Sequence, residues 1–405
     1  MQDMYIDSLT NLPSRFALIK YLQNLEYANI FLIDIDNFSN VNNAYGFKIG
    51  DLLLIEMAKL IAIVKPYNSK LFRLNSDEFV LVSTNKLSLK TLRDDASSMV
   101  SFFDQTDILV LDDIDIKVSV SIGVSTGRGS EILKNARIAI KELREHRRAS
   151  YKIYDPNSSY IKRQQENIYW IDKIKEAFEN EQLITYYQPI INNKTKKIQK
   201  YECLIRILDE GIITPPIRFM EASRLTGTLS LVTKTVIEQS FKKFSSNEYE
   251  FSINITSVDL HLNYLEEFLL KCAKKYDIKP SRLSLEMLED ISTLDTPEII
   301  KQLNMLRYHG FKISIDDFGS QSSNFSRLLR FSPDYLKIDG SFIKNILSDI
   351  KSLIIVETIV SLCKKSNIKV IAEFVHNGEV QAKVEELGVD FSQGYYFGEP
   401  KADLL

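Results

Sequence analysis

Residues Phe311 to Gly319 read FKISIDDFG, and this stretch decides the fold. A short alternating run of apolar residues ends in two adjacent carboxylates, Asp316 and Asp317, followed by a glycine. The run is too short for a helix and rich in β-branched and aromatic residues, so we predict a β-strand with the acids at its C-terminal end. Adjacent carboxylates repel each other unless protons or cations compensate them. For this pair alone a solvated acidic turn is the alternative.

The same arrangement recurs along the C-terminal part of the chain, which favours a built site over a chance acidic turn. Short apolar runs with polar ends are Phe251–Asn254, Leu283–Glu286, Tyr335–Lys337, Lys369–Glu373 and Val389–Gln393. Helix-compatible segments between them are Leu260–Lys275, Pro297–Tyr308, Lys351–Lys365 and Gly378–Leu387. This alternation predicts parallel βαβ units, and enough such units close into a TIM-like α/β barrel. All the polar ends would then face one bowl.

Length and composition predict a globular protein of two domains, because 405 residues exceed one usual domain. The net charge of −3 lacks the basic excess usual for a protein that binds duplex nucleic acid. The three cysteines, Cys203, Cys272 and Cys363, are scattered and odd in number, which favours a reducing, cytoplasmic setting over a disulfide framework. No apolar run approaches the roughly 18 residues of a membrane span, and we expect neither a membrane anchor nor a signal peptide.

The N-terminal part has the pattern of an α+β domain. Residues 7–15, DSLTNLPSR, predict the start of a helix, with Thr10 or Asn11 as the cap and Pro13 in the first turn. A hairpin is expected to turn at Asn75-Ser76, where Asn tolerates positive φ more readily than Ser. The other expected elements are the strand Ile30–Asp36, the helix Leu52–Val64 opened by Asp51, the helix Leu89–Phe103, the strand Ile116–Ile122, the helix Glu131–His146 and the strand Tyr151–Tyr154.

A charged, helix-patterned segment with the only tryptophan, Trp170, follows this domain. We predict domain boundaries at 1–156 and 181–405, with an interdomain helix over 157–180. A rigid helical connection can pass motion between domains, and a helix that only packs on the surface is the alternative.

Taken together, the motifs resemble those of a tandem GGDEF–EAL protein of bacterial cyclic di-GMP signalling, along the whole chain. In the first half they are DSLTNLPSR, then Asp34, Asp36, Phe38, Asn42, Gly46, Gly50 and Asp51, then the hairpin Asn75-Ser76-Asp77-Glu78-Phe79. In the second half they are Gln188-Pro-Ile, Glu202-Cys-Leu-Ile-Arg206, Asn254-Ile-Thr256, Glu286-Met-Leu-Glu289, Asp316-Asp317-Phe-Gly319, Leu336-Lys-Ile-Asp339, Ala372-Glu373-Phe-Val-His376 and Gln393-Gly-Tyr395.

For the first domain, the resemblance implies a GTP site whose hairpin has degenerated. Asp34 and Glu78 would hold magnesium on the triphosphate, Asn42 and Asp51 would contact guanine, and Arg144 and Arg148 would contact phosphate. Asn75 and Ser76 replace two glycines that let the backbone approach the phosphates. We therefore expect no diguanylate cyclase activity. The alternative for this domain is GTP binding without turnover. The family's product-inhibition motif is also missing at Pro66–Ser69.

For the second domain, the resemblance implies a site for two divalent cations. Glu202, Asn254, Glu286 and Asp316 would ligate one cation, and Asp316 would bridge to a second one held by Asp317. Such oxygen ligands suit Mg²⁺ or Mn²⁺ rather than zinc, and paired cations assist in-line attack on a phosphodiester. For any one of these residues taken alone, the alternative to binding a cation is to cap the end of a strand.

The resemblance also implies roles for the residues around the cations. Lys337 would lie near the attacking water and the phosphate charge. Glu373 is the better candidate to hold or deprotonate the water, because a carboxylate accepts a proton and an ammonium cannot. Gln393 would orient water or phosphate. The implied substrate contacts are Gln188, Arg206 and Tyr395, and the implied loop anchor is Glu289 with the Ser320 hydroxyl.

Several departures from the family pattern bear on activity. Cys203 replaces an alanine beside Glu202. Gln321 and Ser322 replace a glycine and an aromatic residue after Asp317, and a misplacement of about 1 Å can cost on the order of a hundredfold in rate. Phe374 stands in place of a glycine. His376 stands in place of a glutamate, either as a pH-sensitive substitute or as a plain surface or packed histidine.

We therefore expect a cyclic di-GMP phosphodiesterase that forms linear pGpG, with the first domain as a regulator that acts through GTP. A homodimer through the EAL half and a separate sensor or effector protein are further expectations from the resemblance. The rival hypothesis is a receptor that binds cyclic di-GMP and signals to a partner without cleaving it. A third is an interaction scaffold that binds no nucleotide.

Overall fold

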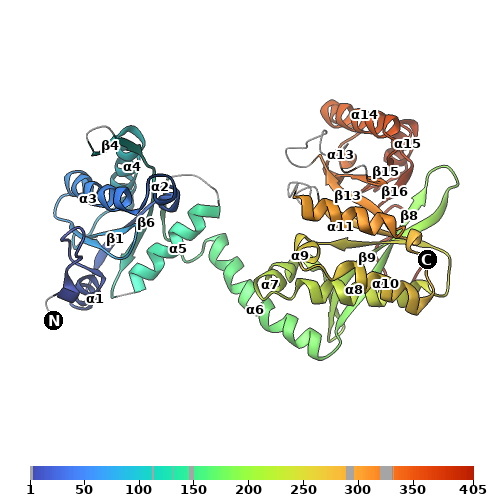
Figure 1. Cartoon of the computed structure of the whole chain (residues 1–405), viewed down its shortest axis with the longest axis horizontal. Coiled ribbons are helices and arrows are strands. Elements are labelled where there is room, and N and C mark those ends of the chain that lie inside the picture. Colours follow the sequence, from blue (N-terminus) through green and yellow to red (C-terminus); the bar gives the residue numbers. More distant parts are fainter. Residues whose placement is uncertain are drawn as a thin grey trace. The chain divides into compact units, whose positions relative to one another are not determined.

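The computed structural model describes residues 3–111, 114–129, 131–145, 150–288, 296–319, 331 and 333–405. The chain forms two compact units, Met1–Arg163 and Gln164–Leu405 (Figure 1). The division lies inside α6 (Ser159–Glu179). None of the helices in the described part of the chain combines the length and apolarity that a membrane crossing requires.

The N-terminal unit is built on a five-stranded sheet in the order β2-β3-β1-β6-β7. Its central strand β1 (Ala28–Ile35) is buried along its whole length and pairs antiparallel with β3 (Glu78–Ser83) and β6 (Val120–Gly127). The outer strands are β2 (Lys70–Arg73) and β7 (Tyr151–Ile153). A separate small sheet pairs β4 (Asp107–Leu111) with β5 (Ile114–Lys117).

Helices cover both faces of this sheet, so alternate residues of β1 enter two different cores. Phe31 and Ile33 pack in the core that contains α3 (Phe47–Val64) and α4 (Leu89–Gln105) residues. Ile30 and Leu32 pack in the core that contains α1 (Arg15–Gln23) and α5 (Glu131–Glu145) residues. The remaining pieces are η1 (Asp3–Tyr5) and α2 (Phe38–Tyr45).

The α+β prediction is confirmed, but several predicted boundaries in this unit are wrong. Residues 7–12 form a turn, because the Asp7 carboxylate accepts hydrogen bonds from the Thr10 amide at 2.8 Å and hydroxyl at 2.6 Å, and α1 starts only at Arg15. Helix α3 begins at Phe47 rather than after Asp51. The predicted strand 116–122 is divided between β5 and β6.

The C-terminal unit is a closed barrel. Strands β9 (Lys197–Asp209), β11 (Glu250–Ile255), β12 (Leu283–Leu288), β13 (Lys312–Phe318), β14 (Tyr335–Ile338), β15 (Lys369–Ala372) and β16 (Phe391–Gln393) run parallel in this order. β8 (Leu183–Asn192) closes the barrel by antiparallel pairing with both β16 and β9. The TIM-like prediction is confirmed, and the antiparallel strand is an addition that the sequence analysis did not predict. A short strand, β10 (Ile212–Thr214), pairs antiparallel with the C-terminal end of β9.

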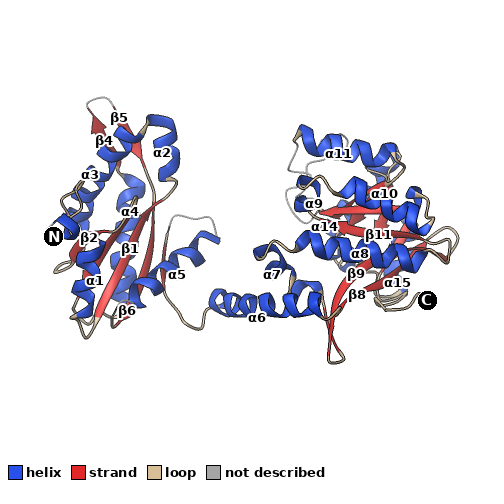
Figure 2. Ribbon diagram, turned by 60° about the horizontal axis from the view of Figure 1, so that its bottom comes forward, coloured by secondary structure: helices blue, strands red, loops and turns tan. Residues whose placement is uncertain are grey.

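Helices surround the barrel, as Figure 2 shows. The main ones are α8 (Leu229–Phe244), α10 (Leu265–Tyr276), α11 (Pro297–Tyr308), α14 (Ile350–Lys365) and α15 (Gly378–Glu386). Shorter ones are α7 (Met220–Leu225), α9 (Ser257–His261), α13 (Gly340–Lys344), η2 (Pro216–Arg218) and η3 (Pro280–Arg282). The predicted helix 260–275 is broken into α9 and α10, because Asn263 adopts a left-handed φ of 52°. Trp170 is partly buried against Phe219.

Strand alternation places the polar residues inside the barrel. Odd-numbered residues of β11, β12 and β13, such as Ile253, Leu285 and Ile313, belong to the large core shared with the helices. The even-numbered residues therefore face the interior. Ser252, Ser284 and Ser314 are buried one layer below the strand ends, and their small size leaves room for the longer side chains above them.

Candidate active site

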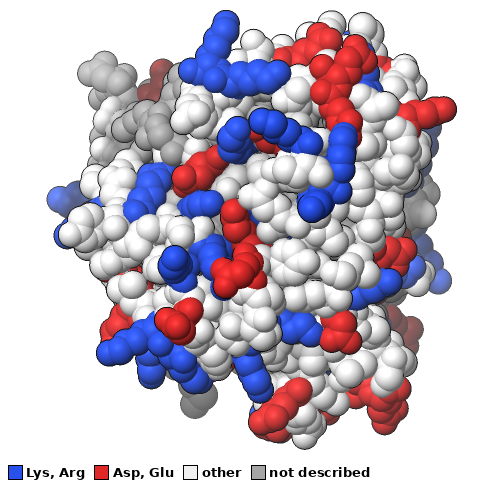
Figure 3. Space-filling view, turned by 90° about the vertical axis from the view of Figure 1, so that its right-hand side faces the viewer, with Lys and Arg blue, Asp and Glu red and all other residues white. Residues whose placement is uncertain are grey.

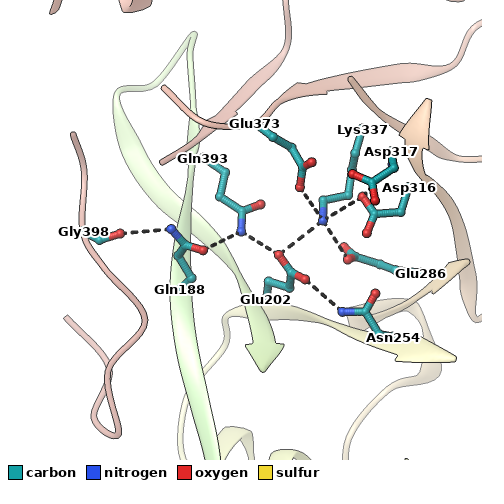
Figure 4. A network of polar contacts seen from close by, with 10 residues as sticks. All are labelled: Gln188, Glu202, Asn254, Glu286, Asp316, Asp317, Lys337, Glu373, Gln393 and Gly398. Atoms are coloured by element: carbon teal, nitrogen blue, oxygen red, sulfur yellow. Dashed lines mark hydrogen bonds and ion pairs between the residues drawn. The ribbon is translucent and has the colours of Figure 1, made fainter. Parts of the chain in front are cut away.

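The polar strand ends predicted from the sequence converge at one end of the barrel. Figure 4 shows them pointing toward a common centre from successive strands. They are the predicted strand-end residues Asn254, Glu286, Asp316, Asp317, Lys337, Glu373 and Gln393, joined by Gln188 and Glu202, which the family resemblance implied.

Lys337 lies at the middle of this cluster and is 1% exposed. Its Nζ is 3.2 Å from Glu202 Oε2 and 3.0 Å from Glu286 Oε2. It is also 3.1 Å from Asp316 Oδ1 and 2.8 Å from Glu373 Oε1. These contacts raise the pKa of Lys337 well above its ordinary value against the effect of burial, so its ammonium stays charged.

A chain of amides fixes Glu202. The Gln393 Nε2 donates to Glu202 Oε2 at 2.6 Å and Asn254 Nδ2 donates to Glu202 Oε1 at 2.9 Å. Gln393 Nε2 also reaches Gln188 Oε1 at 3.1 Å, and Gln188 Nε2 donates to the Gly398 carbonyl at 3.2 Å. Burial alone would raise the pKa of Glu202, but the Lys337 charge and the amide donors outweigh it and leave this pKa below its ordinary value.

The other acids of the cluster are harder to ionise. Burial, helped by the charges of Glu202 and Asp316, raises the pKa of Glu286 to about 8 despite Lys337. Burial and the neighbouring Asp316 charge raise the pKa of Asp317 to about 6. Burial likewise raises the pKa of Glu373 well above its ordinary value. The cluster thus carries more carboxylates than its single ammonium can compensate.

This surplus of carboxyl groups over ammonium groups fits divalent cations, which favour the ionised form of the acids beside them. Oxygen atoms of Glu202, Glu286 and Asp316 lie within 4.8 Å of one another, as do oxygens of Asp316, Asp317 and Glu373. Asp316 belongs to both groups, which agrees with the bridging role expected for it. Glu373 joins the second group, although the sequence analysis assigned it to the water. Asp317 reaches its position through a left-handed φ of 53° at the end of β13.

A cavity of about 320 Å³ opens beside the cluster. The three expected substrate contacts, Gln188, Arg206 and Tyr395, all line it. The other lining residues are Glu202, Leu204, Glu373, Phe374, His376, Gln393, Gly394 and Pro400. Lys337 does not line it, which favours charge compensation over substrate contact for this lysine.

The structure describes Cys203 and His376, two of the residues at which the chain departs from the family pattern. Cys203 is buried in the apolar core, with its side chain on the opposite side of β9 from Glu202. His376 is exposed on the cavity, with Nδ1 3.2 Å from the Phe374 carbonyl oxygen, so it is a surface residue rather than a packed one. Predictions for Arg148, Glu289, Ser320, Gln321 and Ser322 fall outside the described residues.

The N-terminal unit has its own cavity, of about 710 Å³, at the end of β1. Its lining includes Asp36, Asn42, Ser76 and Arg144. Asp36 accepts hydrogen bonds from the Ser119 and Ser121 hydroxyls at 2.9 and 2.7 Å. Of the two residues expected to contact guanine, Asn42 lines this cavity, whereas Asp51 is exposed on α3 and is not part of its lining.

The two carboxylates expected to hold magnesium in this unit are both paired with arginines. Arg144 pairs with Asp34, and Arg137 contacts Glu78 through Nη2 at 2.6 Å and Nε at 3.3 Å. Burial raises the pKa of Asp34 to about 6, and Arg144 opposes this shift. Arg137 was not predicted as a site residue, because only the fold brings its side chain from α5 to Glu78 on β3.

These arginine pairs do not fit a magnesium site. The two guanidinium groups already balance the charges of Asp34 and Glu78. Among the described residues, the groups of three or more acidic, histidine or cysteine side chains close enough to share an ion all lie in the C-terminal unit. At the hairpin turn it is Ser76 that adopts a left-handed φ, of 45°, although Asn75 was expected to tolerate positive φ more readily.

The α+β unit, followed in the sequence by a barrel with an acidic cluster at one end, defines the class of the protein. The EAL domain family model matches residues 171–400, and the model described as diguanylate cyclase, GGDEF domain, matches residues 4–150. The chain belongs to the EAL domain family and carries a GGDEF domain before the EAL domain in the sequence.

Curated relatives match almost the whole of this chain. The chain is 30% identical to the cyclic di-GMP phosphodiesterase PdeB of Shewanella oneidensis, over 98% of this chain and 48% of that protein. It is 28% identical to the bifunctional diguanylate cyclase/cyclic di-GMP phosphodiesterase MucR of Pseudomonas aeruginosa, over 97% of this chain and 60% of MucR. The chain thus spans about half the length of the curated relatives it matches.

Solved structures agree with the fold. The PaMucR phosphodiesterase in complex with c-di-GMP matches with a TM-score of 0.55 and 25% identity, over 57% of this chain and 97% of that one. The S helix-GGDEF-EAL part of Vibrio cholerae LapD matches 97% of this chain and 96% of that one with a TM-score of 0.55. At 17% identity, the LapD match supports the fold alone.

Proposed function

We propose that the barrel unit hydrolyses cyclic di-GMP to linear pGpG. The observation that carries this proposal is the pair of overlapping oxygen clusters that share Asp316 beside a cavity lined by Gln188, Arg206 and Tyr395. Relatives named as cyclic di-GMP phosphodiesterases support the choice of substrate.

Two Mg²⁺ or Mn²⁺ ions are the cofactors that suit the donor set. Glu202, Glu286 and Asp316 would hold one ion, with Asn254 beside them, and Asp316, Asp317 and Glu373 would hold the other. Hard oxygen donors favour these ions over zinc. When bound, the ions supply Lewis-acid polarisation of the phosphodiester.

The other roles in the reaction belong to the chain's own residues. Lys337 keeps the carboxylates together by compensating part of their charge. Glu373 is the residue that would hold or deprotonate the attacking water, because a carboxylate can accept a proton whereas the Lys337 ammonium cannot. Gln393 holds Glu202 and orients the water or phosphate. Arg206, Gln188 and Tyr395 contact the substrate across the cavity.

The first unit acts as a regulator in this proposal and makes no cyclic di-GMP. Its cavity supports GTP as the regulatory ligand, with Asn42 on the guanine and Arg144 on the phosphates. The arginine pairs on Asp34 and Glu78 argue against cyclase chemistry, which would require these carboxylates to be free for a metal.

A direct assay tests the enzyme. Purified protein is incubated with cyclic di-GMP and Mg²⁺ or Mn²⁺ over a range of GTP concentrations, and products are separated by liquid chromatography. We expect linear pGpG, with a rate that depends on GTP. If no linear product forms under any of these conditions, the protein is not this phosphodiesterase.

The second candidate is a cyclic di-GMP receptor that signals to a protein partner. The substitutions at Gln321 and Ser322 favour it, because they change the sequence that follows Asp317. The complete set of oxygen donors disfavours it, since a receptor that does not cleave its ligand has no chemical need for two metal ions. Tight binding of cyclic di-GMP without cleavage in Mg²⁺ or Mn²⁺ would select the receptor. A homodimer through the barrel unit is part of either proposal, and light scattering in solution tests it.

A further inference from the structure

Phe374 has an unusual backbone conformation for an aromatic residue. Its φ is 58°, in the left-handed region that costs energy for any side chain with a Cβ. It directly follows Glu373 and yet is 62% exposed. Burial in the apolar core does not account for this conformation, because most of the residue is exposed, and such strain is common at functional sites.

The phenylalanine ring has a defined position against Gly340. A Cβ added to Gly340 would lie 2.6 Å from Phe374 Cδ2 and 2.9 Å from its Cγ. Gly340 lies at the start of α13, where its φ is open to other residues, so glycine is required there for space and not for backbone freedom. One part of Phe374 therefore packs over Gly340, and the exposed remainder lines the substrate cavity.

The surroundings of Phe374 suit a planar, electron-rich ligand. Tyr395, which is 68% exposed, presents a second aromatic side chain to the same cavity. Leu204 and Pro400 add apolar surface, and Arg206 adds a cation. Aromatic side chains beside a cation are the usual means by which proteins hold an unpaired nucleobase.

We propose that Phe374 is a substrate-binding residue on which one guanine base of the substrate stacks. The proposal rests on the function proposed above. Gly340 provides the space behind the ring, and the left-handed backbone keeps the ring at the cavity, directly beside Glu373. The conformational cost is then offset by stacking when the nucleotide binds.

Substitution of Phe374 by Gly distinguishes a loss of base stacking from a loss of protein stability. It removes the ring and relieves the left-handed strain, so we expect the melting temperature to stay the same or rise. The Kd for cyclic di-GMP, measured by calorimetry in EDTA, should weaken about 5- to 150-fold, the range expected for one stacked base. Phe374→Trp should bind within about threefold of wild type. Asn367→Gly, at another left-handed exposed position with φ 57°, should leave Kd unchanged.

Gly340→Ala tests the packing behind the ring by a double-mutant cycle. In the wild-type background the added methyl displaces Phe374, and we expect weaker binding. In the Phe374→Gly background the same substitution should change Kd by less than twofold. If Phe374→Gly binds as tightly as wild type, or if Gly340→Ala has equal effects in both backgrounds, the stacking role is wrong.

The binding measurement also distinguishes this inference from the proposed function. A wild-type protein that binds cyclic di-GMP without cleaving it would end the hydrolase proposal, while the Kd comparison for Phe374 would still decide the stacking role. A wild-type protein that neither binds nor cleaves cyclic di-GMP would overturn both.

Discussion

Lys337 is the residue on which the acidic cluster depends when no cation is bound. Its ammonium contacts four carboxylates in a buried site. Breaking a buried ion pair by removing one partner typically costs about 3–5 kcal/mol. We therefore expect Lys337→Met to lower the free energy of unfolding by about this amount in EDTA, as measured by urea denaturation. Saturating Mn²⁺ should recover part of the loss, because cations then compensate the carboxylates.

Lys200→Met is the matched control, since Lys200 is also deeply buried in the barrel, at 2% exposure. Its Nζ lies 3.4 Å from Glu250 and 2.9 Å from the centre of the Tyr335 ring. Burial lowers the pKa of Lys200 to about 7, so the folded protein gains little from its charge. Glu250 would keep Lys312 at 3.1 Å. The loss should be smaller than for Lys337→Met and independent of Mn²⁺; equal losses in both variants would contradict the assigned role of Lys337.

Glu202 should be indispensable for turnover. It contributes to the first oxygen cluster and is held by Gln393, Asn254 and Lys337. Glu202→Ala should lower kcat/KM for cyclic di-GMP by more than the roughly 10- to 100-fold typical of losing an outer partner of a metal ligand. Steady-state assays in Mg²⁺ measure this, with Glu210→Ala as the control in the exposed turn after the same strand. Unchanged activity in Glu202→Ala would mean that the metal site is misassigned.

At the scale of elements, helix α5 determines the charge of the first cavity. Asp34 on β1 and Glu78 on β3 are direct cross-strand neighbours, an arrangement of like charges that is unfavourable by itself. Arg137 and Arg144 lie two turns apart on α5 and thus on one side of the helix, and each pairs with one of these acids. The helix thereby supplies the positive charge that a metal would otherwise supply.

Removing one of these arginines should create a cation site. In Arg137→Ala, Glu78 loses its partner while its neighbour Asp34 remains, so we expect one additional weak Mn²⁺ to bind compared with wild type. Calorimetric titration with Mn²⁺ gives the stoichiometry. Arg163→Ala, which breaks a surface pair with Glu145, should leave the stoichiometry unchanged. An identical stoichiometry in Arg137→Ala and wild type would show that the arginine does not replace a metal.

At the scale of the whole molecule, the acidic cluster should make stability depend on pH and on metal. The pKa of Glu286 is raised to about 8 and that of Asp317 to about 6, so the folded state binds more protons than the unfolded state between about pH 4 and 8. Stability in EDTA should therefore fall as the pH rises through this window. Saturating Mg²⁺ should reduce or reverse this fall, because cation binding requires ionised carboxylates.

Thermal melts from pH 5 to 8, with EDTA or with Mg²⁺, measure this dependence. Parallel curves in the two conditions would show that the cluster does not couple protons to cations. On the face shown in Figure 3, basic and acidic side chains are interspersed.

Much of the barrel site could be predicted because its signals are local. Alternation along β11, β12 and β13 assigns every second residue to the interior, and the polar ends of those strands follow directly. The helix Pro297–Tyr308 was predicted at its observed bounds, because Thr296 caps it and Pro297 starts it. Boundaries failed where single residues in left-handed conformations or side-chain caps turn the chain, as at Asn263 and Asp7.

The sequence by itself determined the alternation of strands and helices, the class of each domain and the set of oxygen donors, because side-chain periodicity and turn chemistry depend on near neighbours in the chain. Only the tertiary structure decided which charges meet. The antiparallel closure by β8 brings Gln188 to Gln393, and the packing of α5 on the sheet brings Arg137 to Glu78. Electrostatic energies depend on distances between residues that are remote in sequence, and those distances are set by the fold.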